Sequence, residues 1–167
     1  CSDSRVDPAI MTEASPGELF IIRNVANLVP PYEDRATGFH GVSSAIEFAV
    51  SSLKVENVII LGHRQCGGIR ALVQGTSGEF IGRWMSIAEE AKQAVFTAHA
   101  DADEETKIRL VEMEAIRVSV KNLKSFPFVK EAVKTRNLNI IGVYFDLERG
   151  ELWEWDERAE KFALSQF

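Results

Sequence analysis

The chain has only two cysteines, Cys1 and Cys66, among its 167 residues. Small secreted proteins that depend on disulfides carry several pairs, so this cysteine usage excludes a disulfide framework and leaves room for one bridge at most. Sparse cysteine is typical of proteins from a reducing compartment. We therefore expect a cytoplasmic protein.

Long apolar runs and clusters of basic residues are also missing. No run approaches the ~18 apolar residues that a membrane span requires, and no secretory signal pattern opens the chain. The 19 Lys and Arg residues are scattered and are outnumbered by 25 Asp and Glu residues, which gives a net charge of −6. These absences predict that neither a membrane nor a nucleic acid is a partner.

What the chain does contain is the composition of an ordinary globular protein, with 46% hydrophobic and 26% charged residues. Its length fits one domain, and no internal repeat, low-complexity tract or linker divides it. We expect a single domain over residues 1–167.

Strand and helix patterns alternate along the chain. Short uninterrupted apolar runs at 18–24 and 57–62 predict buried strands, and two further strand patterns at 138–145 and 151–155 flank a turn. Apolar residues that recur every three or four positions predict helices over 39–53, 66–75, 81–99, 104–124 and from Pro127 onward. This order predicts an α/β fold, in which a mainly parallel β-sheet is flanked by helices and carries an antiparallel edge strand or hairpin.

Three potential metal ligands lie near two expected strand ends. His63 and Cys66 follow the strand pattern at 57–62, and Cys1 lies far away in sequence. Loops at the carboxyl ends of strands are where α/β sheets bind ligands, so we expect the three side chains to converge. Two thiolates and one imidazole suit Zn²⁺, and three protein ligands leave a position for water or substrate, as in catalytic zinc sites. A single buried cysteine or histidine is more commonly structural, and it is the combination that predicts a metal site.

The residues around Cys66 favour its reactivity. Cys66 begins an expected helix, whose N-terminus favours thiolate over thiol. Gly67 and Gly68 allow the backbone to pass close to the site and to donate N–H groups to substrate. The alternative is that both glycines serve packing at a strand-to-helix turn.

Asp3 and Arg5 stand two positions apart, so an extended chain places them on one side. An Arg fork holds a carboxylate by both oxygens and keeps it ionised. Such a carboxylate beside zinc has two uses: it can orient the attacking hydroxide, or it can bind the metal and close the site. The alternative is a turn residue beside a surface ion pair.

Four segments resemble, in order and spacing, the β-class carbonic anhydrases. They are Cys1-Ser2-Asp3-Ser4-Arg5-Val6, Gly17-Glu18-Leu19-Phe20, Arg23-Asn24-Val25-Ala26-Asn27 and Gly62-His63-Arg64-Gln65-Cys66-Gly67-Gly68. The similarity extends more weakly to Gly142-Val143-Tyr144-Phe145-Asp146.

The resemblance implies a zinc-dependent lyase that hydrates CO₂ reversibly to bicarbonate and a proton by means of a zinc-bound hydroxide. It implies zinc held by Cys1, His63 and Cys66, with Asp3 and Arg5 as a catalytic pair. It also implies a homodimer or homotetramer, and a helical arm and first strand that precede Cys1 in family members. By the same resemblance, Val42 and Phe48 are candidates for the apolar wall of the substrate pocket, beside the backbone of Gly67 and Gly68.

Some family members bind bicarbonate in a regulatory pocket that favours the closed site. Arg23 and Tyr144 stand where two residues of that pocket lie, although the Arg23 motif is shared with unregulated members. Structural hydrogen bonding is the alternative for both residues. We favour an open, constitutively active site.

Two other functions compete with CO₂ hydration. The same fold and site can hydrolyse CS₂ or COS, or the chain can be a non-catalytic zinc or redox-sensing module in which Cys1 and Cys66 exchange metal for a disulfide. Intact Asp3 and Arg5 favour catalysis, because a sensor has no need of an oriented hydroxide.

Overall fold

The computed structural model describes residues 1–34, 37–75 and 77–165. Its elements follow the expected alternation closely. The helices are α1 (Pro8–Thr12), α2 (Gly41–Glu47), α3 (Gly67–Gln74), α4 (Ile81–Met85), α5 (Glu89–Ala98), α6 (Glu104–Leu123) and α7 (Pro127–Arg136). One π-helical turn, Phe48–Ser52, extends α2, and short 3₁₀ turns lie at Val25–Asn27 and Ser86–Ala88.

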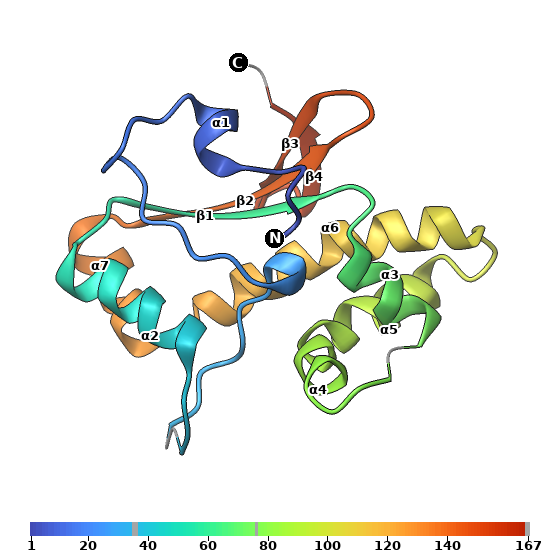
Figure 1. Ribbon diagram of the computed structural model, residues 1–167, viewed down its shortest axis with the longest axis horizontal. Helices are drawn as coiled ribbons and strands as arrows, with labels where there is room; N and C mark the ends of the chain where they lie inside the picture. Colours follow the sequence, from blue (N-terminus) through green and yellow to red (C-terminus); the bar gives the residue numbers. More distant parts are fainter. Residues whose placement is uncertain (35–36, 76, 166–167) are drawn as a thin grey trace.

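The described residues form four strands, β1 (Asn57–His63), β2 (Asn139–Asp146), β3 (Glu151–Asp156) and β4 (Lys161–Leu164), which make one sheet in that order. Strands β1 and β2 are parallel, with His63 opposite Phe145, and β3 and β4 add antiparallel pairs. In Figure 1, α2 to α7 lie below the β1 and β2 ribbons and α1 lies above them. The expected α/β fold with an antiparallel hairpin is confirmed. The described sheet is mixed rather than mainly parallel, because β1–β2 is its one parallel pair and the other two pairs are antiparallel.

Helix α6 lies close against the sheet because two strand positions have no side chain. A Cβ added to Gly62 would lie 2.6 Å from Cδ1 of Ile116, and one added to Gly142 would lie 2.9 Å from Cγ2 of the same residue. The fully buried Ile116 therefore occupies the space that side chains at both glycines would need. This contact fixes the distance between α6 and the strand end that carries His63.

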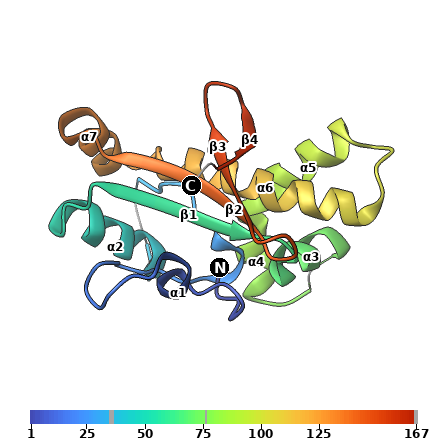
Figure 2. The same cartoon turned by 90° about the horizontal axis from the view of Figure 1, so that it is seen from above.

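Two groups of buried side chains form the core. One joins α3, α5 and α6, and includes Cys66, Ile69, Met85, Ala91 and Val111. The other joins the sheet to α2, α6 and α7, and includes Ile46, Ile60, Ile116, Val129 and Tyr144. Helix α6 contributes to both and lies beside α3 and α5 (Figure 2), so it connects the sheet to the helices around Cys66.

Three expectations about the elements need correction. The predicted strand at 18–24 is wrong: this segment forms no strand in the described chain, and its Leu19, Phe20 and Ile21 side chains are 42–46% exposed. An apolar run marks an extended segment, but it does not show whether another strand covers it. The predicted helix at 81–99 divides at a 3₁₀ turn into α4 and α5, and strand β4 was not predicted.

Among the helices of the described ranges, none combines the length and apolarity needed to cross a bilayer.

Candidate metal centre

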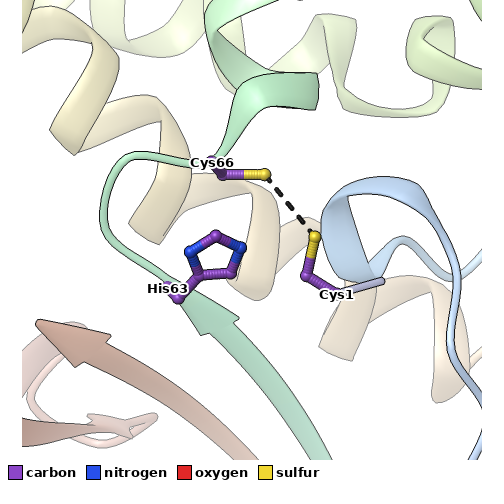
Figure 3. Close-up of side chains that lie close together, drawn as sticks. All are labelled: Cys1, His63 and Cys66. Atoms are coloured by element: carbon purple, nitrogen blue, oxygen red, sulfur yellow. Dashed lines mark hydrogen bonds between the residues drawn. The ribbon is translucent and has the colours of Figure 1, made fainter. Parts of the chain in front are cut away.

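Cys1, His63 and Cys66 converge at the carboxyl end of β1 (Figure 3). His63 is the last residue of β1, Cys66 immediately precedes α3, and Cys1 reaches them from a segment 62 positions earlier than His63. The two Sγ atoms are 3.9 Å apart, and the ligand atoms of all three residues lie within 4.8 Å of one another. His63 and Cys66 are buried and Cys1 is half-buried. The sequence separates these residues, and the fold brings them together.

Local backbone geometry places each ligand. Gln65 adopts a left-handed conformation with φ 59°, which turns the chain sharply from β1 into α3. The segment that carries Cys1 is held by Arg23, whose guanidinium donates to the carbonyl oxygens of Cys1, Asp3 and Val6 at 2.7–3.0 Å. Arg23 therefore serves as a clamp on the first six residues.

His63 presents a free ring nitrogen to the two sulfurs. Its Nδ1 lies 2.8 Å from the carbonyl oxygen of Arg64, and that contact requires a proton on Nδ1. Its Nε2 is buried and has no hydrogen-bond partner among the described residues. Burial lowers the pKa of His63, which keeps the imidazole neutral and its Nε2 lone pair available. A buried nitrogen with no partner is costly, and a cation beside the sulfurs would satisfy it.

The pKa of the Cys66 thiol differs from what its position at a helix N-terminus predicts. Burial, the largest effect, raises the pKa of Cys66, while the backbone N–H groups of Ile69 and Gly68 act in the opposite direction. The net shift is upward, so the helix N-terminus by itself does not make a thiolate here. A bound dication is the charge that would stabilise it.

The donor set fits zinc. Two sulfurs and one imidazole nitrogen are soft to borderline ligands, and Zn²⁺ prefers this combination in four-coordinate sites. No carboxylate of the described residues joins the three ligands in one group.

The Asp3 carboxylate is held by Arg5 instead. Nε of Arg5 donates to Oδ1 of Asp3 at 2.9 Å, its Nη2 donates to Oδ2 at 2.6 Å, and its backbone N–H also reaches Oδ1. The hydrogen bond from Arg5 is the largest cause that holds the pKa of Asp3 well below its usual range. Asp3 is therefore an ionised carboxylate with a fixed orientation, two positions after Cys1 in the chain.

The turn between His63 and Cys66 is anchored by residues that sequence reasoning missed. Gln65 accepts from Nη1 of Arg5 at 3.2 Å and donates to Glu148 at 2.7 Å. Arg64 pairs with the buried Asp146 at 3.1 Å and with Glu148 at 2.9 Å. The turn is therefore tied both to the Asp3–Arg5 pair and to the loop after β2. Nothing in the sequence pairs these residues, because more than 80 positions separate the turn from Asp146.

Glu112 is a second missed residue. It lies on α6, is only 3% exposed, and accepts the backbone N–H of Cys66 at 2.8 Å and the Tyr144 hydroxyl at 2.9 Å. Burial, the largest cause, raises the pKa of Glu112. The available sequence signal was an acidic residue inside the apolar stripe of a helix, where charges are uncommon.

The predicted substrate-binding residues differ in packing and exposure. A Cβ on Gly67 would meet no atom of the described residues within 4 Å, whereas one on Gly68 would lie 2.9 Å from Val25, so Gly68 is closely packed. Val42 is half-buried against the core, and Phe48 is half-exposed with its ring centroid 5.9 Å from that of Phe20. Their roles toward substrate stay predictions.

The structure does not bring Arg23 and Tyr144 together through a shared partner. Arg23 binds backbone carbonyls near Cys1 and pairs with Asp7 at 3.5 Å, whereas the fully buried Tyr144 donates to Glu112. Among the described residues, each side chain therefore has a structural hydrogen-bonding role, and the regulatory role stays a prediction.

Comparison with known proteins agrees with this geometry. A family model described as carbonic anhydrase matches residues 1–152. The chain is 40% identical to beta carbonic anhydrase 3 of Arabidopsis thaliana, over 99% of this chain and 67% of that protein. The chain belongs to the β-carbonic anhydrases.

Solved structures of this family have the same fold. The β-carbonic anhydrase CcaA superposes with a TM-score of 0.90 at 30% identity, over 99% of this chain and 81% of that one. One of two tetrameric β-carbonic anhydrases of Sordaria macrospora superposes with a TM-score of 0.76 at 29% identity, over 92% of this chain and 76% of that one. The family assignment therefore rests on sequence and on fold together.

Proposed function

We propose that this β-carbonic anhydrase hydrates CO₂ reversibly to bicarbonate and a proton, with Zn²⁺ as its metal. The observation that carries the proposal is the convergence of Cys1, His63 and Cys66 beside an ionised Asp3 carboxylate fixed by Arg5. We further propose that residues 1–167 act as one catalytic domain.

Each residue has a distinct task in this proposal. Zn²⁺ bound by the three ligands supplies a Lewis acid that lowers the pKa of a water ligand toward roughly 7. The thiolates of Cys1 and Cys66 offset the charge of the cation, and the Nδ1 contact of His63 orients its ring. Asp3 keeps lone pairs that Arg5 does not occupy, so it can accept a hydrogen bond from the attacking oxygen and aim it at CO₂.

The Asp3–Arg5 pair also bears on the competing functions. A redox module needs Cys1 and Cys66 close together, which the 3.9 Å sulfur separation provides, but it has no use for an oriented carboxylate. Catalysis uses both features. We favour CO₂ over CS₂ and COS as the substrate because the chain belongs to the carbonic anhydrase family.

Stopped-flow CO₂ hydration on zinc-quantified protein tests the proposal. We expect Asp3→Ala to retain zinc and to lose roughly tenfold or more of the hydration rate, as variants of residues that orient a metal site do. Asp103→Ala is the matched control, because Asp103 caps α6 and lies outside the ligand group. Wild-type protein that is fully loaded with zinc but does not hydrate CO₂ at neutral to alkaline pH would refute the proposal.

We also propose that the chain assembles into a homodimer or homotetramer. Apolar side chains at Leu19, Phe20, Ile21 and Phe48 are 42–50% exposed, and burying them against a second copy would be favourable. Light scattering during size-exclusion chromatography tests this, and a monomer across the accessible concentration range would contradict it. A cytoplasmic location stays a prediction.

A further inference from the structure

The backbone N–H of Cys66 has an unusual partner. Cys66 is the residue before α3, where a Glu or Gln three positions later commonly reaches back to accept this N–H. That position is Ile69 here, which has no acceptor. The acceptor is instead Oε1 of Glu112, which belongs to α6 and lies 46 positions away in the chain. A distant helix therefore provides the bond that the local sequence lacks.

Glu112 is itself fixed from the other side. Its second oxygen, Oε2, accepts the hydroxyl of Tyr144 at 2.9 Å, and Tyr144 is fully buried on β2. In the parallel register, Tyr144 lies opposite Gly62, which is the residue before His63. The carboxylate thus connects the start of α3 to the strand pair that carries His63.

The chemistry of the two donors explains why a carboxylate occupies this position. An N–H and an O–H both point at the side chain, and only a carboxylate offers an acceptor oxygen to each. A glutamine would also accept from Cys66, but its amide group would face the Tyr144 hydroxyl and force that hydroxyl to turn.

We propose that Glu112 is a positioning residue of the metal centre: it fixes the backbone of Cys66, and so the place of its sulfur relative to Cys1 and His63. This inference rests on the proposed zinc site. Groups that orient metal ligands without touching the metal typically change metal affinity or activity by about tenfold to a hundredfold. Tyr144 supports the same function by holding Glu112.

Zinc affinity and the visible spectrum of the Co²⁺-substituted protein test this proposal. Glu112→Ala removes the acceptor at Cys66, and we expect a loss of zinc affinity of about tenfold or more together with shifted thiolate-to-cobalt bands. Glu112→Gln keeps an acceptor for Cys66 and should restore most of the affinity.

Ser119→Ala is the matched control. Ser119 lies on the same helix, is fully buried, and accepts the backbone N–H of Val29 at 3.2 Å. Its loss also leaves a buried N–H without a partner, but at Val29 rather than at Cys66. We expect Ser119→Ala to lower stability while the zinc affinity and the cobalt spectrum stay those of the wild type.

Tyr144→Phe gives an independent reading if Glu112→Ala does not fold. It frees Oε2 without touching Cys66, and we expect a smaller loss of zinc affinity in the same direction. The proposal is overturned if Glu112→Ala matches Ser119→Ala in affinity and spectrum, or if Tyr144→Phe is identical to the wild type in both. Failure of the wild-type protein to bind zinc would instead refute the proposed function.

Discussion

Alanine at Gly67 and alanine at Gly68 should have opposite effects on stability, although the two glycines are neighbours in the first turn of α3. A Cβ on Gly67 meets nothing within 4 Å in the part of the chain that the structure describes. A Cβ on Gly68 would lie 2.9 Å from Cγ1 of Val25 and 3.1 Å from the Cβ of Ala26. Val25 is 40% exposed and can move, whereas Ala26 is fully buried and cannot.

The magnitude follows from two opposing effects. Replacing glycine by alanine inside a helix stabilises by roughly 0.5–1 kcal/mol because the unfolded chain loses freedom. Overpacking costs typically about 1–3 kcal/mol. Gly67→Ala therefore gains up to about 1 kcal/mol, and Gly68→Ala loses about 1–2 kcal/mol net.

Thermal unfolding of the zinc-loaded variants measures the difference. For a chain of this length, each kcal/mol corresponds to about 2–4 °C, so we expect Gly68→Ala to melt roughly 2–8 °C below the wild type and Gly67→Ala to melt at or above it. Equal shifts for both variants would refute the assignment of Gly68 to packing, and a lower midpoint for Gly67→Ala would contradict the open space around Gly67.

Three further predictions concern the surroundings of the site. Gly62→Ala places a Cβ 2.6 Å from the buried Ile116 and should cost about 3 kcal/mol, seen as a lower urea midpoint; an unchanged midpoint contradicts the close packing of α6. Asp146→Asn should cost about 2 kcal/mol at neutral pH, measured by denaturant unfolding, because the hydrogen bonds from Arg64 are charge-assisted. Burial alone would raise the pKa of Asp146, but the bonds from Arg64 and the Glu148 N–H lower it. Its stabilisation is therefore present above the unfolded pKa of about 3.9 and lost as the pH falls through the lower folded pKa, so a difference from the wild type that persists in acid contradicts this reasoning. Removing zinc with a chelator should abolish hydration and lower stability by about 4 kcal/mol relative to protein in zinc at a thousandfold its Kd; an unchanged melting curve contradicts metal-linked folding.

The candidate metal ligands His63 and Cys66 were predictable because their signals are local. An uninterrupted apolar run ending in Gly62 marks a buried strand, and β1 ends one residue later, at His63. Cys66 follows at the start of a helix whose pattern is equally clear. Parallel sheets gather ligands at their strand ends, so position in the fold followed from position in the sequence.

The residues that hold the site could not be predicted in this way. In the sequence, Glu112 is an acidic residue at an apolar position of a helix. Its role depends on hydrogen bonds from Cys66 and Tyr144, which lie 46 and 32 positions away. Asp146 and its partner Arg64 are 82 positions apart. A hydrogen bond between distant side chains leaves no periodicity in either segment.

The upward shift of the Cys66 pKa shows the same limit. The helix N-terminus was visible in the sequence, but the depth of burial that outweighs it depends on how α3, α5 and α6 pack. Local electrostatics and tertiary burial shift the pKa of the same thiol in opposite directions, and no local sequence pattern predicts the burial.

X-ray absorption at the zinc edge, on purified protein with its metal content quantified, is the most direct test of the whole account. It should show one zinc per chain with two sulfur ligands and an imidazole nitrogen, and Cys66→Ser should remove one of the sulfurs. A chain that retains no zinc, or one whose zinc has no sulfur ligand, would contradict the assignment of Cys1, His63 and Cys66 as the metal centre.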